Sequence, residues 1–213
     1  MGFGISILLH LIFLLIISSI IAFFSLIITY FASKTKNKKR KLFLSIFIPF
    51  HIFFSFYLFA FIGIVFVSEI KNVDIGIGDT WYAPIDESYQ ILMIDLPEHA
   101  FIEFNGNSIL SDVSEIQQID KKVFCRTYHE KFYSINLIKN KLTEYQNIEE
   151  LKNAENLPNV NLIKVDKFYQ TRKWEVSGIL TIIIVALSII ISIITAIAIY
   201  KFIIYGNIVP SKN

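Results

Sequence analysis

The residues of this chain whose types and spacing could do chemistry are few, and its single cysteine comes first. Cys125 and His129 form a Cys-x3-His pair, which in an active site could be a thiolate and its imidazole base. On a β-strand the two side chains share a face but lie about 13 Å apart. We therefore expect Cys125 to be a half-buried strand residue. A lone cysteine also excludes an internal disulfide and a cysteine-rich zinc site.

A second candidate is the acidic, glycine-containing stretch that begins at Asp74. Carboxylates on glycine-rich turns are what a calcium site uses, so Asp74, Asp79 and Asp86 are candidate metal ligands. The stretch lacks the oxygen spacing of an EF-hand loop, and the competing interpretation is a solvated linker before the first strand. Four further polar residues lie close together in the sequence, namely Asp95, Glu98, His99 and Glu103. Such spacing is common by chance and predicts no acid/base role.

Sequence motifs for catalysis are absent. The chain contains no Gly-x-Ser-x-Gly, His-Glu-x-x-His, Walker or dinucleotide-binding pattern. We therefore predict no catalytic residue, no cofactor and no enzymatic activity.

Two histidines lie inside long apolar stretches, where an ionisable side chain is a candidate functional group. His10 and His51 are expected to differ in depth by roughly 15 Å, which argues against a shared metal or proton. Pro49 has no N–H to donate, so a backbone carbonyl near His51 needs another partner. Two interpretations of His51 stay open, a neutral structural residue and a proton-relay or ligand role. The apolar stretches contain no Asp, Glu or Arg, which disfavours a transporter or proton pump.

The elements that position these residues are predicted to be embedded in a membrane. Of 213 residues, 54% are hydrophobic and 18% are charged, whereas soluble domains carry about a quarter charged residues. Residues 3–33, 42–68 and 176–205 contain a single charged side chain, Lys201, while residues 70–175 contain 29. At about 1.5 Å per residue, each apolar stretch exceeds the roughly 30 Å hydrocarbon core. We predict three transmembrane helices over these ranges.

The orientation follows from a basic loop, residues 34–41, between the first two spans. Its basic residues are Lys34, Lys36, Lys38, Lys39, Arg40 and Lys41. The positive-inside rule places this loop in the cytoplasm, so the N-terminus and residues 69–175 lie outside and the tail 206–213 lies inside. A nuclear localisation run and an anionic-lipid site are competing interpretations of the same loop. Abundant Ile, Lys, Phe and Asn fits a bacterium, so we expect a multi-pass inner-membrane protein.

Small residues indicate how the spans pack, because helices in lipid associate where small side chains let their backbones approach. The stripes comprise Ser18, Ala22, Ser25 and Thr29 in the first span and Ser188, Ser192 and Thr195 in the third. The second span instead carries nine Phe residues between Phe43 and Phe66. We expect a three-helix bundle in which the first and third spans are in close contact.

Residues 69–175 are predicted to form a small α+β domain inserted between spans 2 and 3, an antiparallel β-meander with one or two short helices. Strand patterns cover residues 89–96, 99–104, 110–119, 123–128, 132–138 and 162–165. Pro97 should end the first of these strands, and Asn105-Gly106 should form a hairpin turn. Asn147 is the predicted N-cap of a helix that ends at Leu157-Pro158. Tyr169 and Trp174 are expected to be interface anchors before the third span.

The charge of this domain indicates its class of partner. Residues 70–175 contain 12 basic and 17 acidic residues, a net charge of −5, which argues against nucleic acid. We expect an integral membrane protein whose acidic extracytoplasmic domain binds a protein at the outer face, as a non-enzymatic envelope accessory or immunity-type factor. A homo-oligomer is compatible with the sequence. The alternative is a small membrane-bound enzyme or sensor input module with its site in residues 70–175.

Overall fold

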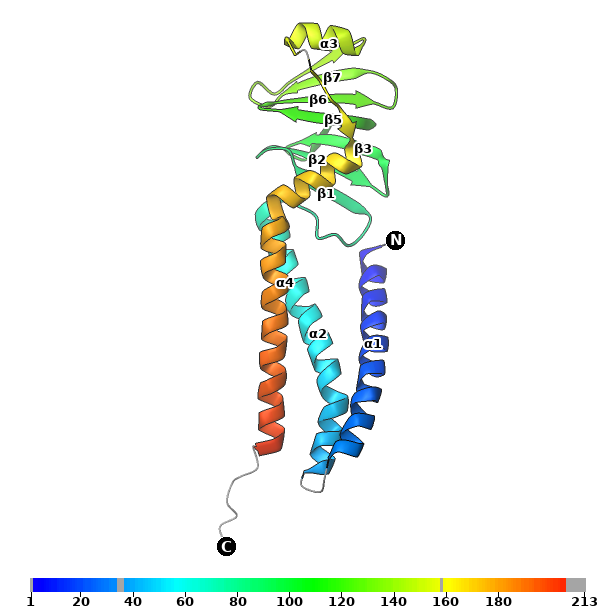
Figure 1. The fold of residues 1–213 in the computed structure, drawn as a ribbon. Helices are drawn as coiled ribbons and strands as arrows, with labels where there is room; N and C mark the ends of the chain where they lie inside the picture. Colours follow the sequence, from blue (N-terminus) through cyan, green and yellow to red (C-terminus); the bar gives the residue numbers. More distant parts are fainter. Residues whose placement is uncertain (1, 34–36, 158, 206–213) are drawn as a thin grey trace. The chain divides into compact units, whose positions relative to one another are not determined.

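The structure, a computed structural model, describes residues 2–33, 37–157 and 159–205. Within these ranges the elements are α1 (Phe3–Ala32), α2 (Lys38–Lys71), β1 (Thr80–Pro84), β2 (Tyr89–Ile94), β3 (Leu96–Phe104), β4 (Asn107–Leu110), β5 (Val113–Ile119), β6 (Lys122–Thr127), β7 (Phe132–Asn136), β8 (Lys141–Tyr145), α3 (Ile148–Glu155), β9 (Ile163–Lys164) and α4 (Val165–Tyr205) (Figure 1). The chain divides into two compact units. We call Val67–Ile179 the β unit, and Phe3–Phe66 with the chain from Leu180 onward the helical unit.

The helical unit is built from α1, α2 and most of α4, which are long and apolar enough to cross a membrane. The helices extend beyond the predicted spans. Lys38–Lys41 form the first turn of α2 rather than part of a loop, because lysine and arginine both favour the helical conformation. Lys34 and Lys36 lie outside the described residues, as does the predicted tail. The third long helix begins at Val165, well before residue 176.

Within the helical unit, α2 lies between α1 and α4 (Figure 1). The rings of Phe3 in α1 and Phe61 in α2 have centroids 6.3 Å apart. On the α4 side, a Cβ added at Gly63 would lie 2.3 Å from Cγ2 of Ile184, so the two backbones approach closely there. These contacts join α2 to each of the other two helices, and the predicted contact between the first and third spans stays a prediction. Gly63 in the Phe-rich helix is a site of close approach that the sequence analysis did not name.

The β unit contains two antiparallel sheets rather than one meander. Their strand orders are β1-β2-β3-β4 and β8-β7-β6-β5-β9. Strands β5 to β8 do form a meander, so the prediction is right in part. The predicted strand over residues 110–119 is divided because Asp112 has a φ of 57°, which ends pairing after β4 and lets β5 start a second sheet.

A shared core joins the two sheets to the first turns of α4. It includes Ile91 and Ile102 from the first sheet, Val123 from the second, and Val165 and Phe168 from α4. The opposite face of the second sheet has a smaller core, where Phe124 packs with Tyr145 and Leu151 of α3. Residues 123 and 124 therefore serve different cores, as the alternation of a β-strand requires.

Of three local predictions for turns, caps and strand ends in the β unit, two are confirmed and one is wrong. The Asn105-Gly106 turn is confirmed, with φ of 48° and 78° between β3 and β4. The N-cap is also confirmed, because the Asn147 side chain accepts the Glu150 N–H at 2.9 Å. The prediction for Pro97 is wrong, since this residue lies inside β3. The β2–β3 register shifts beside it, and an irregularity of this kind tolerates a residue that cannot donate to the ladder.

Candidate functional site

A polar cleft of about 530 Å³ lies in the β unit where β3, β5, β6 and the start of α4 converge. Its charged and phenolic lining residues are Glu98, Glu115, Arg126, Tyr128, Glu130, Lys164 and Asp166. Strand pairing positions the central part, because Glu115 of β5 faces Arg126 of β6 on one side and Lys164 of β9 on the other. The β5–β6 register shifts at Ser114, and such bulges often aim side chains into sites.

The cleft has more negative than positive side chains, and they differ in how they are paired. Arg126 is neutralised by two carboxylates, at 3.4 Å from Glu115 and 3.1 Å from Glu130. Glu98 and Asp166 have neither an ion pair nor a hydrogen bond to their carboxylates among the side chains that the structure describes. Four carboxylates thus face two cations in the lining, which leaves the cleft with a net charge of −2.

Tyr128 adds a hydroxyl to the same cleft. Burial raises the pKa of this phenol, and the negative charges of Glu98 and Asp166 raise it further. The hydroxyl therefore stays protonated over the physiological range and remains a donor. The cleft also contains the cations Arg126 and Lys164, but its net charge of −2 suits a cationic group better than an anionic one.

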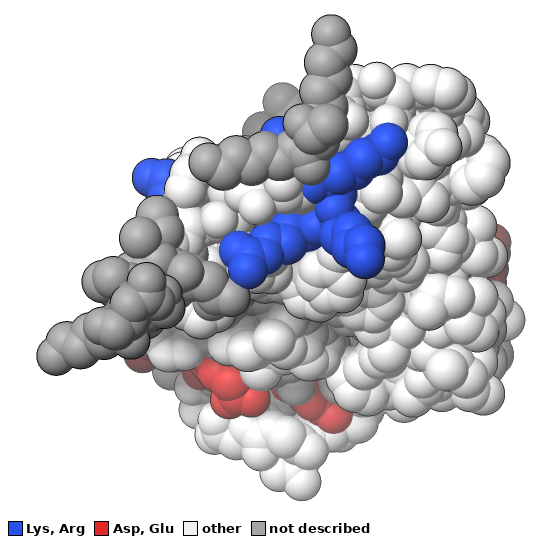
Figure 2. Space-filling model, turned by 90° about the horizontal axis from the view of Figure 1, so that it is seen from below, with Lys and Arg blue, Asp and Glu red and all other residues white. Residues whose placement is uncertain are grey.

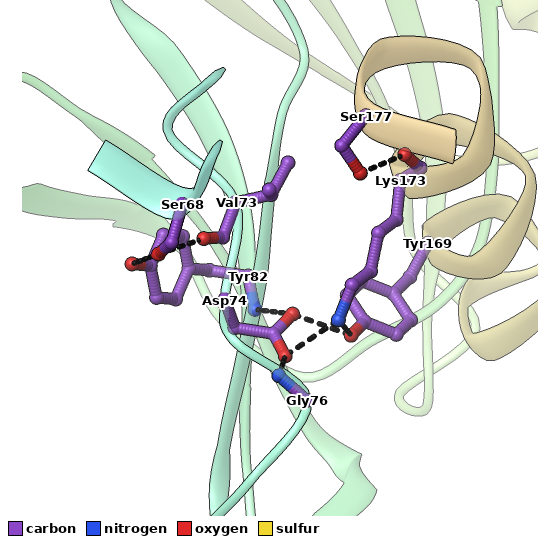
Figure 3. A network of polar contacts seen from close by, with 8 residues as sticks. All are labelled: Ser68, Val73, Asp74, Gly76, Tyr82, Tyr169, Lys173 and Ser177. Carbon is purple, nitrogen blue, oxygen red and sulfur yellow. Dashed lines mark hydrogen bonds and ion pairs between the residues drawn. The ribbon is translucent and has the colours of Figure 1, made fainter. Parts of the chain in front are cut away.

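A second polar group, which we call the Asp74 clasp, is buried in the same unit (Figure 3). The Asp74 carboxylate is 4% exposed and lies 2.7 Å from the ammonium of Lys173. Tyr169 donates its hydroxyl to the other carboxylate oxygen, and Lys173 also donates to the Tyr169 oxygen at 3.1 Å. Backbone N–H groups of Gly76 and Tyr82 complete the shell at 2.7 and 3.3 Å.

The clasp fixes the segment after α2 onto α4. Ser68 in the last turns of α2 donates to the carbonyl of Val73, and the Asp74 N–H donates to the Tyr82 carbonyl in β1. Burial raises the pKa of Tyr169 well above its usual range, and the hydrogen bond and charge of Asp74 act in the same direction. Tyr169 is thus a protonated donor to Asp74, and its predicted role as an interface anchor stays a prediction.

The three candidate metal ligands serve separate local structures. Asp74 is occupied by the clasp. Asp86 accepts the backbone N–H groups of Ser88 and Tyr89, each at 2.9 Å, in the turn between β1 and β2. Asp79 accepts the Asp95 N–H through its backbone carbonyl. In the described part of the chain, no three His, Cys, Asp or Glu side chains are grouped so as to hold a metal ion.

The two membrane-stretch histidines have different partners in the helical unit. His51 Nε2 lies 2.9 Å from the Thr195 hydroxyl, which itself donates to backbone carbonyls of α4. The bond joins α2 to α4, and the Nε2–H tautomer of His51 is the donor when the Thr195 proton goes to a carbonyl. His10 Nδ1 lies 3.4 Å from the hydroxyl of Tyr57 and joins α1 to α2. Each histidine thus makes its own helix contact.

Cys125 and His129 lie in different surroundings. Cys125 is fully buried in β6, and burial raises the pKa of its thiol well above the usual range. His129 is exposed in the following turn, with Nε2 3.8 Å from an Asp112 oxygen. The buried thiol therefore lacks the ionised form that nucleophilic chemistry needs.

The residues predicted to pack the helices or to anchor them at the interface lie in α1 and α4. In the small-residue stripes, Ser18, Ala22, Ser188 and Ser192 are buried and Ser25, Thr29 and Thr195 are half-buried. Ser192 and Ser188 donate to carbonyls one turn earlier in α4. Trp174 is 63% exposed and lies along α4 beside Gly178. The side chain of His99 is outside the described residues.

The comparisons with known proteins identify no relative. No protein-family model, curated protein or solved structure matches the chain. Function must therefore be argued from the cleft and the helices themselves. Sequence reasoning missed both Asp166 and Arg126, and it named Glu98 only as part of a chance cluster. The one available signal was the excess of acidic over basic residues in the domain.

Proposed function

We propose that the protein is a non-enzymatic binding protein of a bacterial inner membrane, and that its polar cleft holds a basic segment of a partner protein. The observation that carries this proposal is the pair of unneutralised carboxylates, Glu98 and Asp166, beside Tyr128. Carboxylates flanking an aromatic ring suit a lysine or arginine side chain, which gains both charge attraction and contact with the ring face.

The membrane placement supports the same proposal. Helices α1, α2 and α4 have the length and composition to cross a bilayer, and their surfaces expose large apolar side chains such as Phe13, Phe31 and Ile179. In water such surfaces would be strongly unfavourable, whereas lipid covers them at no cost. The positive-inside rule puts the basic start of α2 inside and residues 69–175 outside, which is the side where an envelope accessory or immunity-type factor would act.

The test uses the full chain in detergent and two labelled peptides, hexalysine and hexaglutamate, followed by fluorescence anisotropy. We expect hexalysine alone to bind, and Glu98→Gln with Asp166→Asn to weaken it at least fivefold. The matched control, Asp120→Asn with Glu149→Gln, removes two charges away from the cleft and should change the affinity less than twofold. Equal losses in the two double variants would show diffuse attraction to an acidic surface and would refute the cleft as the site.

A further inference from the structure

The helical unit contains an apolar groove of about 340 Å³ between α2 and α4. Ile48 and Ile52 line it on α2, and Ile193, Ala196 and Ile197 line it on α4. Ala196 is the smallest of these side chains, and it presents only a methyl group to the groove. Tyr200, Tyr205 and Lys201 form its remaining wall toward the end of α4.

The end of this groove is strongly basic. Lys201 lines it, and Arg40 at the start of α2 donates to the backbone carbonyl of Ile203 at 3.2 Å, so the first turn of α2 and the last turns of α4 lie together. Seen from this end, most of the visible Lys and Arg surface forms a central group, and a smaller patch lies apart from it (Figure 2). The residues at this end are Lys38, Lys39, Arg40, Lys41 and Lys201.

These cations have no acidic counterpart within the helical unit. Residues 3–66 and 180–205 contain no Asp or Glu. Lys201 lines the groove, and the four basic residues at the start of α2 belong to the same end of the helical unit, where Arg40 contacts α4. These charges therefore call for an anion supplied from elsewhere. A free phosphate would satisfy the charges but leave the groove empty, and a second apolar helix would fill the groove but leave the charges unpaired.

We propose that the groove is a binding site for an anionic phospholipid, whose acyl chain lies between α2 and α4 and whose phosphate is held by Lys201 and the basic start of α2. One molecule of this class satisfies the apolar lining and the charge together. The site rests on the proposal that these helices span a bilayer, but it is independent of the polar cleft.

The experiment measures lipid retained by the full chain in native mass spectrometry, using phosphatidylglycerol and phosphatidylcholine with identical acyl chains. We expect one phosphatidylglycerol to be retained at least fivefold better than phosphatidylcholine. Lys201→Gln should reduce this preference to less than twofold while some binding of both lipids persists. Ala196→Phe, which fills the groove, should abolish retention of both lipids. Glycerol phosphate, which lacks acyl chains, should not displace the bound lipid.

Two control variants make the same changes elsewhere. Lys139→Gln alters a charge in the β unit, and Ile190→Phe enlarges an exposed side chain of α4 that does not line the groove. Both should retain lipid as the native chain does. Unchanged retention by Ala196→Phe, or equal retention of the two lipids by the native chain, would overturn the proposal. So would a dimer whose contact excludes lipid, since a second copy would then occupy the groove.

Membrane insertion is tested separately from lipid retention. Each variant is first tested for resistance to carbonate extraction from membranes. A native chain that is extracted would refute the spanning helices on which the site rests, whereas an inserted chain without lipid preference would refute the site alone.

Discussion

Asp74 carries a charge that has been almost entirely removed from water. Two hydrogen-bonded partners on α4, Tyr169 and Lys173, are needed to stabilise it, together with nearby backbone N–H groups. Removing one member of a buried pair is costly because the other is left without its counter-charge, whereas removing both is cheaper. The clasp is therefore best tested through single and double variants.

We predict that Asp74→Asn destabilises the protein by on the order of 3 kcal/mol, because the Lys173 ammonium loses its partner. Adding Lys173→Met should recover part of that loss. Denaturant unfolding of the full chain in detergent, followed by tryptophan fluorescence, measures both effects. Glu87→Gln, on an exposed side chain, is the matched control and should change little. A double variant less stable than Asp74→Asn would contradict the coupling.

At the scale of elements, α3 is attached to the second sheet through Glu155. Its carboxylate accepts hydrogen bonds from Lys122 at 2.5 Å, Ser134 at 2.7 Å and Tyr145 at 2.8 Å. Burial by itself raises the pKa of Glu155, but these hydrogen bonds outweigh it and the pKa is lowered. Ionised Glu155 thus stabilises the packing of α3 on β6, β7 and β8.

The pH dependence follows from that direction. A lowered pKa in the folded state means that the stabilisation is complete above the unfolded value of about 4.3 and is lost as the pH falls below it. Glu155→Gln should cost about 2 kcal/mol at pH 7 and flatten the decline in melting temperature between pH 5 and pH 3. The exposed Glu149→Gln should keep the native decline. A native slope in Glu155→Gln would contradict the assigned role.

Packing of α2 on α4 gives a second prediction for elements. A side chain at Gly63 would collide with Ile184, so Gly63→Val should force the helices apart and lower the melting temperature in detergent. Ser192→Leu, at a buried position of α4, should do the same. Phe66→Leu changes an exposed residue of α2 and should have little effect. Equal melting of Gly63→Val and the native chain would rule out close packing at this glycine.

The sequence predicted interior strands and the edge strand β9, but it missed the edge strands β1 and β8. Strands β2 and β6 each pair with a strand on both sides, and their apolar runs made them predictable. Strands β1 and β8, which were not predicted, are the edges of their sheets and carry Pro84 and Lys141. Such residues protect an edge from aggregation but erase the alternation that reveals a strand.

The candidate site was less predictable, because its members are distant in sequence. In the sequence, Asp74 is separated from Lys173 and Tyr169 by both sheets. Glu98 and Asp166 come from distant segments and line one cleft in the fold, where β9 pairs with β5 just before Asp166. Composition could indicate an acidic domain, but it contains no information on these contacts. Gly63 is important because Ile184 of α4 packs directly against it. No local sequence pattern could have predicted that contact.

At the scale of the whole molecule, the basic start of α2 predicts which side of the membrane holds each segment. A cysteine placed at Asn37 should be shielded from impermeant thiol reagents in intact cells, and one at Asn153 should react. The native Cys125 is fully buried and provides a silent background. Labelling at Asn37 with protection at Asn153 would reverse the orientation and move the polar cleft to the cytoplasm.

The division into two units predicts where the chain can be cut. Residues 67–179 contain both sheets, α3, the Asp74 clasp and the part of α4 that supplies Val165 and Phe168 to the core. Residues 80–170 retain the strands but lose Asp74 and Lys173. Both fragments should give mixed β/α circular dichroism. The longer should melt cooperatively at a higher temperature, because the hydrogen bonds of the Asp74 clasp join its two ends. Asp74→Asn with Lys173→Met in the longer fragment should remove most of that difference in melting temperature.

Two outcomes would contradict this prediction. Equal melting temperatures of the two fragments would show that the strands alone set the stability. A non-cooperative melt of the longer fragment would show that the membrane helices complete its core.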